Sequence, residues 1–147
     1  MSRGNLVRIG IIAVVVVGAL LFRDRLSGSA TDLSVGDCFD EPAGTEVAEV
    51  QHRPCTEGHD AEIVFVGDYP DQDAFPGQTA IDEYVYDSCI PAFETYLGID
   101  YETDTDYDLG AFSPLEDGWR SGDHEISCYV YRLDGAQLTT SLKGVGG

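Results

Sequence analysis

Hydrophobic residues follow three different spacings along this chain, and each spacing predicts a different element. Residues 6–22 form an almost unbroken apolar run, LVRIGIIAVVVVGALLF. Residues 79–97 repeat apolar side chains every three or four positions, and residues 126–133 alternate from one position to the next. These spacings are typical of a membrane-spanning helix, an amphipathic helix and a half-buried strand, respectively.

The first segment is long enough to span a membrane as a helix. Its 17 residues reach about 25 Å, and Arg8 is close enough to the end to extend into the headgroups, which makes up the shortfall from a hydrocarbon core of roughly 30 Å. We predict a retained signal anchor at residues 6–22, preceded by a cytoplasmic tail at residues 1–5. Cleavage after Gly28-Ser29-Ala30 is the alternative, but charged residues 23–25 separate that site from the apolar run.

Net charge differs sharply between the two parts of the chain. Residues 1–30 carry four arginines against one aspartate, a balance of +3, and the remainder carries four basic residues against 26 acidic ones, a balance of −22, which together give the −19 of the chain. An acidic domain of this kind is repelled by phosphate backbones and by anionic lipid surfaces. We therefore expect no nucleic-acid partner.

Four cysteines lie in the roughly 115 residues that follow the anchor: Cys38, Cys55, Cys89 and Cys128. An even number of cysteines in a small exported domain predicts two disulfides, which require an oxidising compartment. We therefore place the amino terminus in the cytoplasm and the domain, residues 33–144, outside the membrane. A polar linker at residues 23–32 would join the two; the alternative is a cytosolic domain with reduced thiols.

The helical spacing predicts one helix at residues 79–97. Thr79 and Asp82 resemble a capping box at its start, and Gly98 is a natural stop. Pro91 cannot donate a hydrogen bond to the carbonyl of Asp87, so we expect a kink there or a break into two helices.

Strands are predicted at residues 47–51, 61–66 and 126–133, and residues 137–142 after the Asp134-Gly135 turn are expected to complete a hairpin. Alternation in the second strand places two sets on opposite faces: Ala61, Ile63 and Phe65 on one, and Glu62, Val64 and Val66 on the other. The acidic residues 99–118 are expected to be irregular. The fold class is α+β, a small and mainly antiparallel sheet with one helical segment packed on a face.

This packing favours one of the three possible disulfide connectivities. Cys89 lies on the apolar stripe of the predicted helix, and Cys128 lies on the inward face of the last strand. A bridge between them would join helix to sheet, which leaves Cys38 to pair locally with Cys55.

Chemistry could be carried by His59, Asp60 and Glu62, as a base with an orienting carboxylate or, with His52 or His124, as a metal ligand set. The structural alternative is a turn histidine that precedes a strand. No serine or cysteine nucleophile accompanies these residues at a recognisable spacing. We therefore assign no catalytic residue, no metal ligand and no cofactor.

The spacing of Asp104, Asp106 and Asp108 copies the first three carboxylates of a calcium loop. The copy fails next, because Leu109 stands where the loop requires glycine and Leu115 where it requires glutamate. We expect a solvated acidic loop, with weak calcium binding as the alternative.

Several tyrosines could form an exposed amphipathic surface for a protein or glycan: Tyr69, Tyr101, Tyr107, Tyr129 and Tyr131. The alternative is that most of them pack against the sheet. Trp119 is expected to anchor the core ahead of the last strand.

Three motifs in order carry a resemblance to a known family. They are Val35-Gly36-Asp37-Cys38-Phe39, then Cys55 followed by His59-Asp60-Ala61-Glu62, then Trp119-x-x-Gly122-Asp123-x-x-x-x-Cys128. Together with Cys89 and the closing residues 140–144, they resemble the bacterial septum-formation domain family over about residues 33–144.

The resemblance implies a membrane-anchored envelope protein, linked by name to the division septum, with no established reaction. The matched residues look structural: Gly36, Asp37, His59, Asp60, Glu62, Trp119, Gly122 and Asp123, besides the four cysteines. We expect a non-enzymatic, membrane-tethered interaction domain whose partners are envelope or division proteins. An envelope enzyme or metal-dependent binder using His59, Asp60 and Glu62 is the alternative, and a surface protein unrelated to division is a third.

Overall fold

The computed structural model describes residues 27–29, 32–44 and 49–147 of the chain. The elements are β1 (Ser27–Ser29), β2 (Cys38–Asp40), β3 (Glu49–Arg53), β4 (Ala61–Asp68), α2 (Gln78–Leu97), β5 (Tyr107–Phe112), α3 (Glu116–Arg120) and β6 (Glu125–Arg132). The predicted tail and membrane anchor lie outside the described residues. Within the described ranges, no helix combines the length and the apolar character that a membrane crossing needs.

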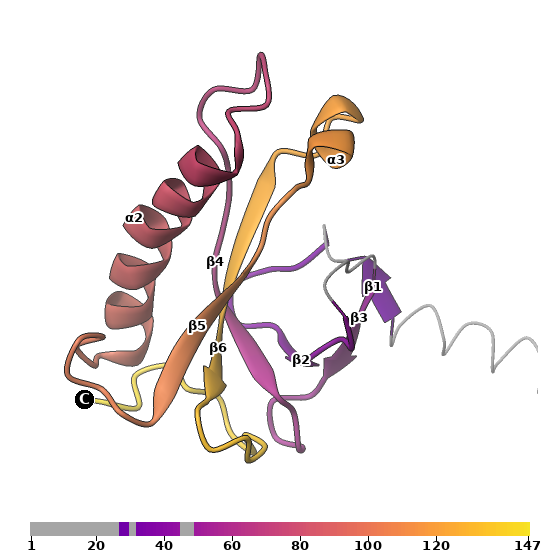
Figure 1. The fold of residues 1–147 in the computed structure, drawn as a ribbon. Coiled ribbons are helices and arrows are strands. Elements are labelled where there is room, and N and C mark those ends of the chain that lie inside the picture. Colours follow the sequence, from indigo (N-terminus) through magenta and orange to yellow (C-terminus); the bar gives the residue numbers. More distant parts are fainter. Residues whose placement is uncertain (1–26, 30–31, 45–48) are drawn as a thin grey trace, which may run out of the picture.

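The six strands form one antiparallel sheet in the order β1-β3-β2-β4-β6-β5. The helix α2 lies along one face of the β4, β6 and β5 part of this sheet (Figure 1). The expected α+β class is therefore confirmed, with one main helix on an antiparallel sheet. β1 lies within the stretch that was expected to be a linker, and it pairs with β3.

The helix α2 begins one residue earlier than predicted, and its start differs from the expected capping box. Gly77 is the N-cap, with φ 91°, and no side chain caps the first turn. The amide of Gln78 instead donates to Asp82 at 2.9 Å. Gly98 ends the helix in the left-handed conformation, as expected.

Pro91 does not break α2 into two helices. The helix runs continuously from Gln78 to Leu97 with Pro91 inside it (Figure 1). The proline ring is exposed, whereas Cys89 and Phe93 on either side of it are buried against the sheet. Burial of this apolar stripe stabilises the helix enough to offset the hydrogen bond that the proline removes.

A bulge in β4 overturns the predicted alternation of its side chains. Ile63 pairs with Tyr129 and Phe65 pairs with Cys128, so Val64 is the extra residue. Val64 and Phe65 both belong to the cluster beneath α2, and Val66 joins the cluster on the opposite face. The prediction was wrong for Phe65 and Val66 because a bulge shifts every later side chain to the other face.

The core is divided between the two faces of the sheet. The cluster beneath α2 is buried: Val64, Cys89, Phe93, Leu97, Cys128, Val130, Leu138 and Leu142. The cluster on the opposite face is Leu33, Phe39, Val50, Ala61, Ile63 and Tyr129. A third cluster joins Trp119, as expected, to Ile81 and Ile126.

Two disulfides reinforce this small core, with the favoured connectivity. Cys38 is bonded to Cys55 between β2 and the turn after β3, and Cys89 is bonded to Cys128, which joins α2 to β6. Helix and sheet are therefore linked covalently as well as by packing.

The second half of the chain departs twice from the sequence expectations. Residues 99–118 contain the edge strand β5 and the start of the short helix α3. Residues 137–142 are not a strand; their one ladder contact is an isolated bridge between His59 and Leu138. Both sides of β6 are already occupied by β4 and β5, so no edge remains for a hairpin partner.

Gly110 explains why β5 was missed and why it packs so closely. A Cβ atom at this position would lie 2.2 Å from Cζ of Tyr129, so the aromatic ring covers the backbone of β5 directly. Glycine weakens the local strand signal, but here it allows two backbones and a ring to approach closely.

Candidate functional site

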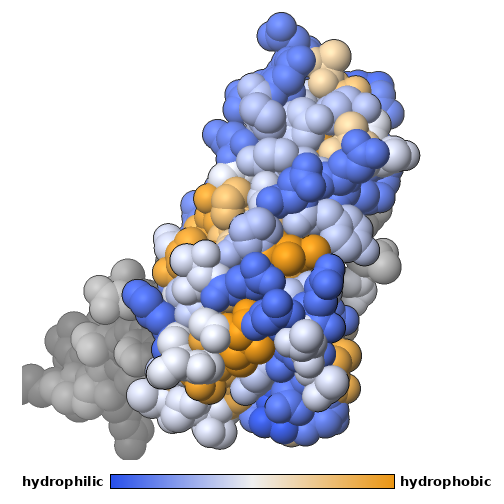
Figure 2. All heavy atoms as spheres, turned by 90° about the vertical axis from the view of Figure 1, so that its left-hand side faces the viewer, coloured by the Kyte–Doolittle hydropathy of each residue, from blue (hydrophilic) through white to orange (hydrophobic). Residues whose placement is uncertain are grey.

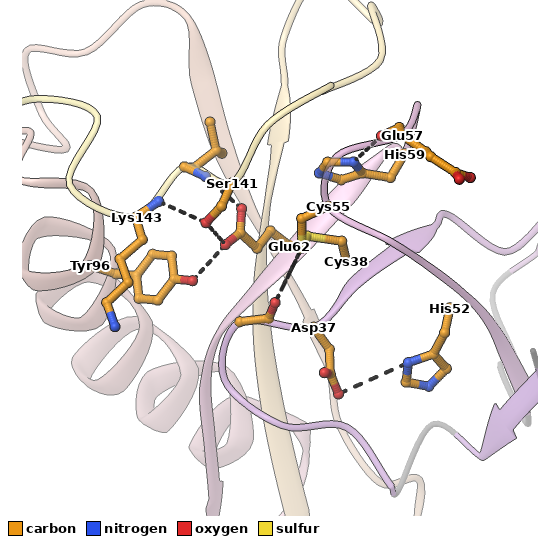
Figure 3. Close-up of a disulfide and its surroundings, with 12 residues drawn as sticks. Asp37, Cys38, His52, Cys55, Glu57, His59, Glu62, Tyr96, Ser141 and Lys143 are labelled. Carbon is orange, nitrogen blue, oxygen red and sulfur yellow. Dashed lines mark hydrogen bonds and ion pairs between the residues drawn. A yellow bond between two sulfur atoms is a disulfide. The ribbon is translucent and has the colours of Figure 1, made fainter. Parts of the chain in front are cut away.

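A polar part of the described interior surrounds Glu62 and the Cys38–Cys55 disulfide. Cys38 of β2 and Glu62 of β4 are paired across the sheet. A carboxylate oxygen of Glu62 and the two sulfur atoms all lie within 4.8 Å of one another. Figure 3 shows the carboxylate between this disulfide and the closing segment of the chain.

Glu62 is fully buried, and its two oxygen atoms accept three hydrogen bonds. Oε1 accepts from the hydroxyl of Tyr96 at 2.5 Å and from the hydroxyl of Ser141 at 2.6 Å. Oε2 accepts from the backbone N–H of Leu142 at 2.7 Å. A buried carboxylate without such donors would be strongly destabilising, so these contacts hold β4, α2 and the closing segment together.

The same contacts affect the Tyr96 hydroxyl. Burial, and then the hydrogen bond to Glu62, raise the pKa of Tyr96 to about 12. The tyrosine is therefore neutral and acts as a hydrogen-bond donor throughout the physiological range.

His59 is also fully buried, in the turn before β4. Its Nδ1 lies 2.8 Å from the carbonyl oxygen of Glu57, and because a carbonyl only accepts, Nδ1 carries the hydrogen. Nε2 has no hydrogen-bond partner among the described residues. The backbone N–H and carbonyl of His59 both bond to Leu138, so this residue also holds the closing segment.

Asp60 completes the set with two more long-range contacts. Its Oδ2 accepts from the N–H of Glu41 at 3.0 Å, and its Oδ1 accepts from the side-chain amide of Gln137 at 3.1 Å. His59, Asp60 and Glu62 therefore point to three different sets of partners rather than toward a shared substrate position.

The first motif, around Gly36 and Asp37, forms a turn that pairs with β4. Gly36 has φ 95° and donates its N–H to the carbonyl of Ile63. The N–H of Ile63 donates to the carbonyl of Asp37. The Asp37 carboxylate accepts from the N–H of Ser34 at 2.9 Å. A left-handed glycine is required here for the chain to turn into β2.

The last motif surrounds α3. Trp119 is buried, Gly122 has φ 94°, and the Asp123 carboxylate accepts from the N–H of Glu125 at the start of β6. His124 packs against the Trp119 ring with centroids 4.6 Å apart. Each of these residues sets the path of the chain into β6.

Comparison with known proteins agrees with this arrangement of motifs. The family model described as septum formation matches residues 35–145. The chain belongs to the septum-formation family. The comparisons with curated proteins and with solved structures returned no match.

The three histidines of this septum-formation domain lie in separate surroundings. His59 is enclosed beside Leu138, whereas His52 has Nδ1 4.0 Å from Oδ2 of Asp37, and His124 packs on Trp119. Among the described residues, one group of three metal-ligating side chains converges, namely Cys38, Cys55 and Glu62. Its two sulfur atoms are joined in a disulfide, so they are not available as thiolate ligands.

The aspartates that resemble a calcium loop stabilise the edge of β5. Oδ2 of Asp104 accepts from the N–H groups of Asp106 and Tyr107. Oδ1 of Asp108 accepts from the N–H of Leu109 and from the hydroxyl of Tyr101, both at 2.8 Å. These carboxylates therefore occupy backbone donors of the edge strand.

The tyrosines that were considered for an exposed surface are half-buried or buried. Tyr129 is 9% exposed and packs between Phe39 and Phe112. Burial and the carboxylate of Glu41 raise the pKa of Tyr129. Tyr86 of α2, which the sequence did not single out, is 65% exposed.

Sequence reasoning missed Tyr96 and Ser141 as partners of Glu62. They lie 34 and 79 residues after it, and no spacing in the sequence connects them. A glutamate on the inward face of a predicted strand was the one available signal, since such a residue needs buried donors.

Proposed function

We propose that this septum-formation domain is a non-enzymatic interaction domain, tethered to the cytoplasmic membrane and acting outside it, in the bacterial cell envelope or at the division septum. Its partners would be envelope or division proteins. The tether would be the apolar segment at residues 6–22.

The two disulfides support a location outside the cytoplasm, because such bonds persist in oxidising compartments. The apolar segment at residues 6–22 and the excess of arginines over acidic residues in residues 1–30 support a single-pass anchor. Membership of the septum-formation family supports a role in the envelope.

The non-enzymatic part of the proposal rests on the burial and the hydrogen bonds of Glu62. Its carboxylate accepts three hydrogen bonds from α2 and from the closing segment, and it is fully buried. A general acid or base must instead reach a substrate atom. The polar residues of the motif thus support a scaffold, and the outer surface remains for binding.

Localisation tests the proposal first. A fluorescent protein fused ahead of Met1 would fold in the cytoplasm and leave the domain free. We expect a midcell band in dividing cells. An even outline of the cell would contradict the septal assignment, and diffuse cytoplasmic fluorescence would contradict the anchor.

A double substitution separates scaffold from enzyme. We expect His59→Ala with Asp60→Ala to lower the melting temperature. The first substitution removes a fully buried ring and its hydrogen bond to the carbonyl of Glu57, and the second removes the contacts of the Asp60 carboxylate with Glu41 and Gln137. A variant that keeps its melting temperature but loses the midcell band or the cellular phenotype would favour the envelope enzyme or metal-dependent binder.

A further inference from the structure

We propose that the groove between α2 and β5 binds a partner segment in which one apolar side chain is flanked by lysines or arginines. This inference rests on the proposed function, since it names the surface and the chemistry by which the domain would recognise an envelope protein. The partner binds by inserting its apolar side chain between helix and strand.

The groove is preformed, and most of the side chains that line it are apolar, with the carboxylate of Asp108 among them. Its cavity volume is about 310 Å³, and the lining includes Val85, Tyr86, Ile90, Tyr101, Leu109 and Ala111. Figure 2, which views the molecule from the α2 side, shows apolar patches surrounded by hydrophilic residues. A volume of this size lies at the lower end of the range for ligand pockets and accommodates one or two side chains.

The walls of the groove are held in place before any partner arrives. The Cys89–Cys128 disulfide joins α2 to β6, and the Tyr101 hydroxyl donates to Asp108 at 2.8 Å. Walls that are already ordered lower the entropic cost of binding. Tyr86, which is 65% exposed, lies at the edge of this groove as an aromatic contact of the kind that dominates protein interfaces.

The surroundings of the groove are acidic. α2 carries Asp82, Glu83, Asp87 and Glu94, residues 98–106 carry four more carboxylates, and neither stretch contains lysine or arginine. Asp82 and Glu83 lie three or four positions from Tyr86 and so share its side of the helix. Arg132, on the strand next to β5, is paired with Asp134.

This charge selects the partner. A second copy of the chain would bring the same carboxylates against themselves, and a like-charge contact of that kind costs free energy. A segment with lysine or arginine beside its apolar anchor would instead gain from the acidic rim. The complementary charge also favours rapid association at low salt.

Recognition uses side chains rather than strand addition. The N–H groups of Tyr107 and Leu109 in the edge strand already donate to the carboxylates of Asp104 and Asp108. These contacts protect the edge against pairing with another strand. We therefore place the attachment in the groove beside the edge.

Photocrosslinking in cells that contain the full membrane-bound chain tests the proposal. Tyr86 is replaced by p-benzoylphenylalanine, and the crosslinked peptide is sequenced by mass spectrometry. We expect a segment with at least two basic residues beside an apolar one. Asp82→Lys with Glu83→Lys should lower the crosslinking yield roughly fivefold.

Glu49→Lys with Glu57→Lys is the matched control, because both residues are exposed on the β3 side and the change in charge is the same. It should leave the yield unchanged, and circular dichroism should show that both variants are folded at the temperature of the crosslinking experiment. The proposal is overturned by the absence of a crosslink, by a crosslinked segment without basic residues, by a crosslink to a second copy, or by an equal loss in the control.

The cellular location of the same chain distinguishes the two proposals. A midcell band without a basic crosslink overturns the groove and leaves the proposed function in place. A basic crosslink in cells with an even outline supports the groove and contradicts the septal assignment. Failure of both readouts overturns both.

Discussion

The hydroxyl of Tyr96 donates a 2.5 Å hydrogen bond to Oε1 of Glu62, which joins the last turns of α2 to the first residues of β4. The same oxygen accepts from Ser141, so the bond also ties the closing segment to the sheet (Figure 3). A single buried carboxylate thus connects three parts of the chain that are distant in sequence.

We predict that Glu62→Gln lowers the free energy of unfolding by about 2–3 kcal/mol, because one acceptor becomes a donor facing donors in the interior. Tyr96→Phe should cost about 1–2 kcal/mol, since it removes one charge-assisted hydrogen bond. Urea unfolding of the full chain in detergent, followed by the fluorescence of its single tryptophan, measures both.

Glu125→Gln is the control for this pair, because Glu125 is half-buried and accepts one side-chain hydrogen bond, at 3.3 Å from Ser127. It should have a much smaller effect. Additive losses in the double variant Glu62→Gln with Tyr96→Phe would show that the two side chains are not coupled, contrary to the geometry.

Alkaline pH should unfold the domain through its tyrosines. Burial, and then a carboxylate partner, raise the pKa values of Tyr96 and Tyr101 to about 12, above the ordinary value of 10.0. A raised pKa in the folded state means that the neutral hydroxyl is favoured there. Its contribution to stability is therefore complete below pH 10 and is lost as the pH rises to about 12.

Absorbance of tyrosinate during a rapid pH titration, compared with circular dichroism, measures this effect. We expect the most accessible tyrosines to ionise first and the buried ones to ionise together with unfolding. Tyr96→Phe should make the loss of stability between pH 10 and 12 shallower. Ionisation of all eight tyrosines near pH 10 in a folded domain would contradict the assignment.

The two disulfides should contribute unequally to stability. They close separations of 17 and 39 residues. In the chain-entropy model these loops correspond to about 3 and about 4 kcal/mol, respectively. Cys89→Ala with Cys128→Ala should therefore be the more destabilising of the two paired substitutions in urea.

The reverse order would show that contacts near Glu62, rather than loop length, dominate the effect of the Cys38–Cys55 bond. Each pair is compared with the parent chain under non-reducing conditions. Single substitutions are avoided because they leave a free thiol that can exchange with the other bond.

We predict that substitution by alanine has opposite effects at two glycines. Gly110→Ala should destabilise the domain by about 1–3 kcal/mol, since its Cβ would lie 2.2 Å from the Tyr129 ring. Gly118→Ala in α3 places its Cβ no closer than 3.6 Å to another atom. Alanine is the better helix former there, so this variant should be neutral or more stable by up to about 1 kcal/mol.

Thermal unfolding of the two variants compares them directly. Restoring stability to Gly110→Ala with the second substitution Tyr129→Leu would identify the ring as the cause. Equal melting temperatures for all variants would mean that β5 does not pack closely on β6.

The edge strand shows why part of the fold could not be predicted. Residues 107–112 contain a glycine and an aspartate and alternate poorly, so the local pattern indicated a loop. Their strand conformation depends on pairing with β6 and on the carboxylates of Asp104 and Asp108. Pairing partners are set by the whole sheet, and a short window does not contain them.

The local sequence was sufficient to predict the elements in which the hydrophobic pattern directly reflects the buried face. Apolar spacing along α2, strict alternation along β6 and the inward positions of Cys89 and Cys128 were each sufficient, because burial of one face requires a fixed period. The same positions favoured the disulfide connectivity that the structure contains.

Tertiary structure alone decided the bulge at Val64, the fate of residues 137–142 and the partners of Glu62. Each depends on atoms that are far apart in the chain. The closing segment bonds to Glu62 of β4 because this buried carboxylate needs hydrogen-bond donors, and it bonds to the backbone of His59 in the turn before β4. Hydrophobic periodicity indicates which residues are buried, whereas the hydrogen-bond partners of buried polar groups are determined only in the complete tertiary structure.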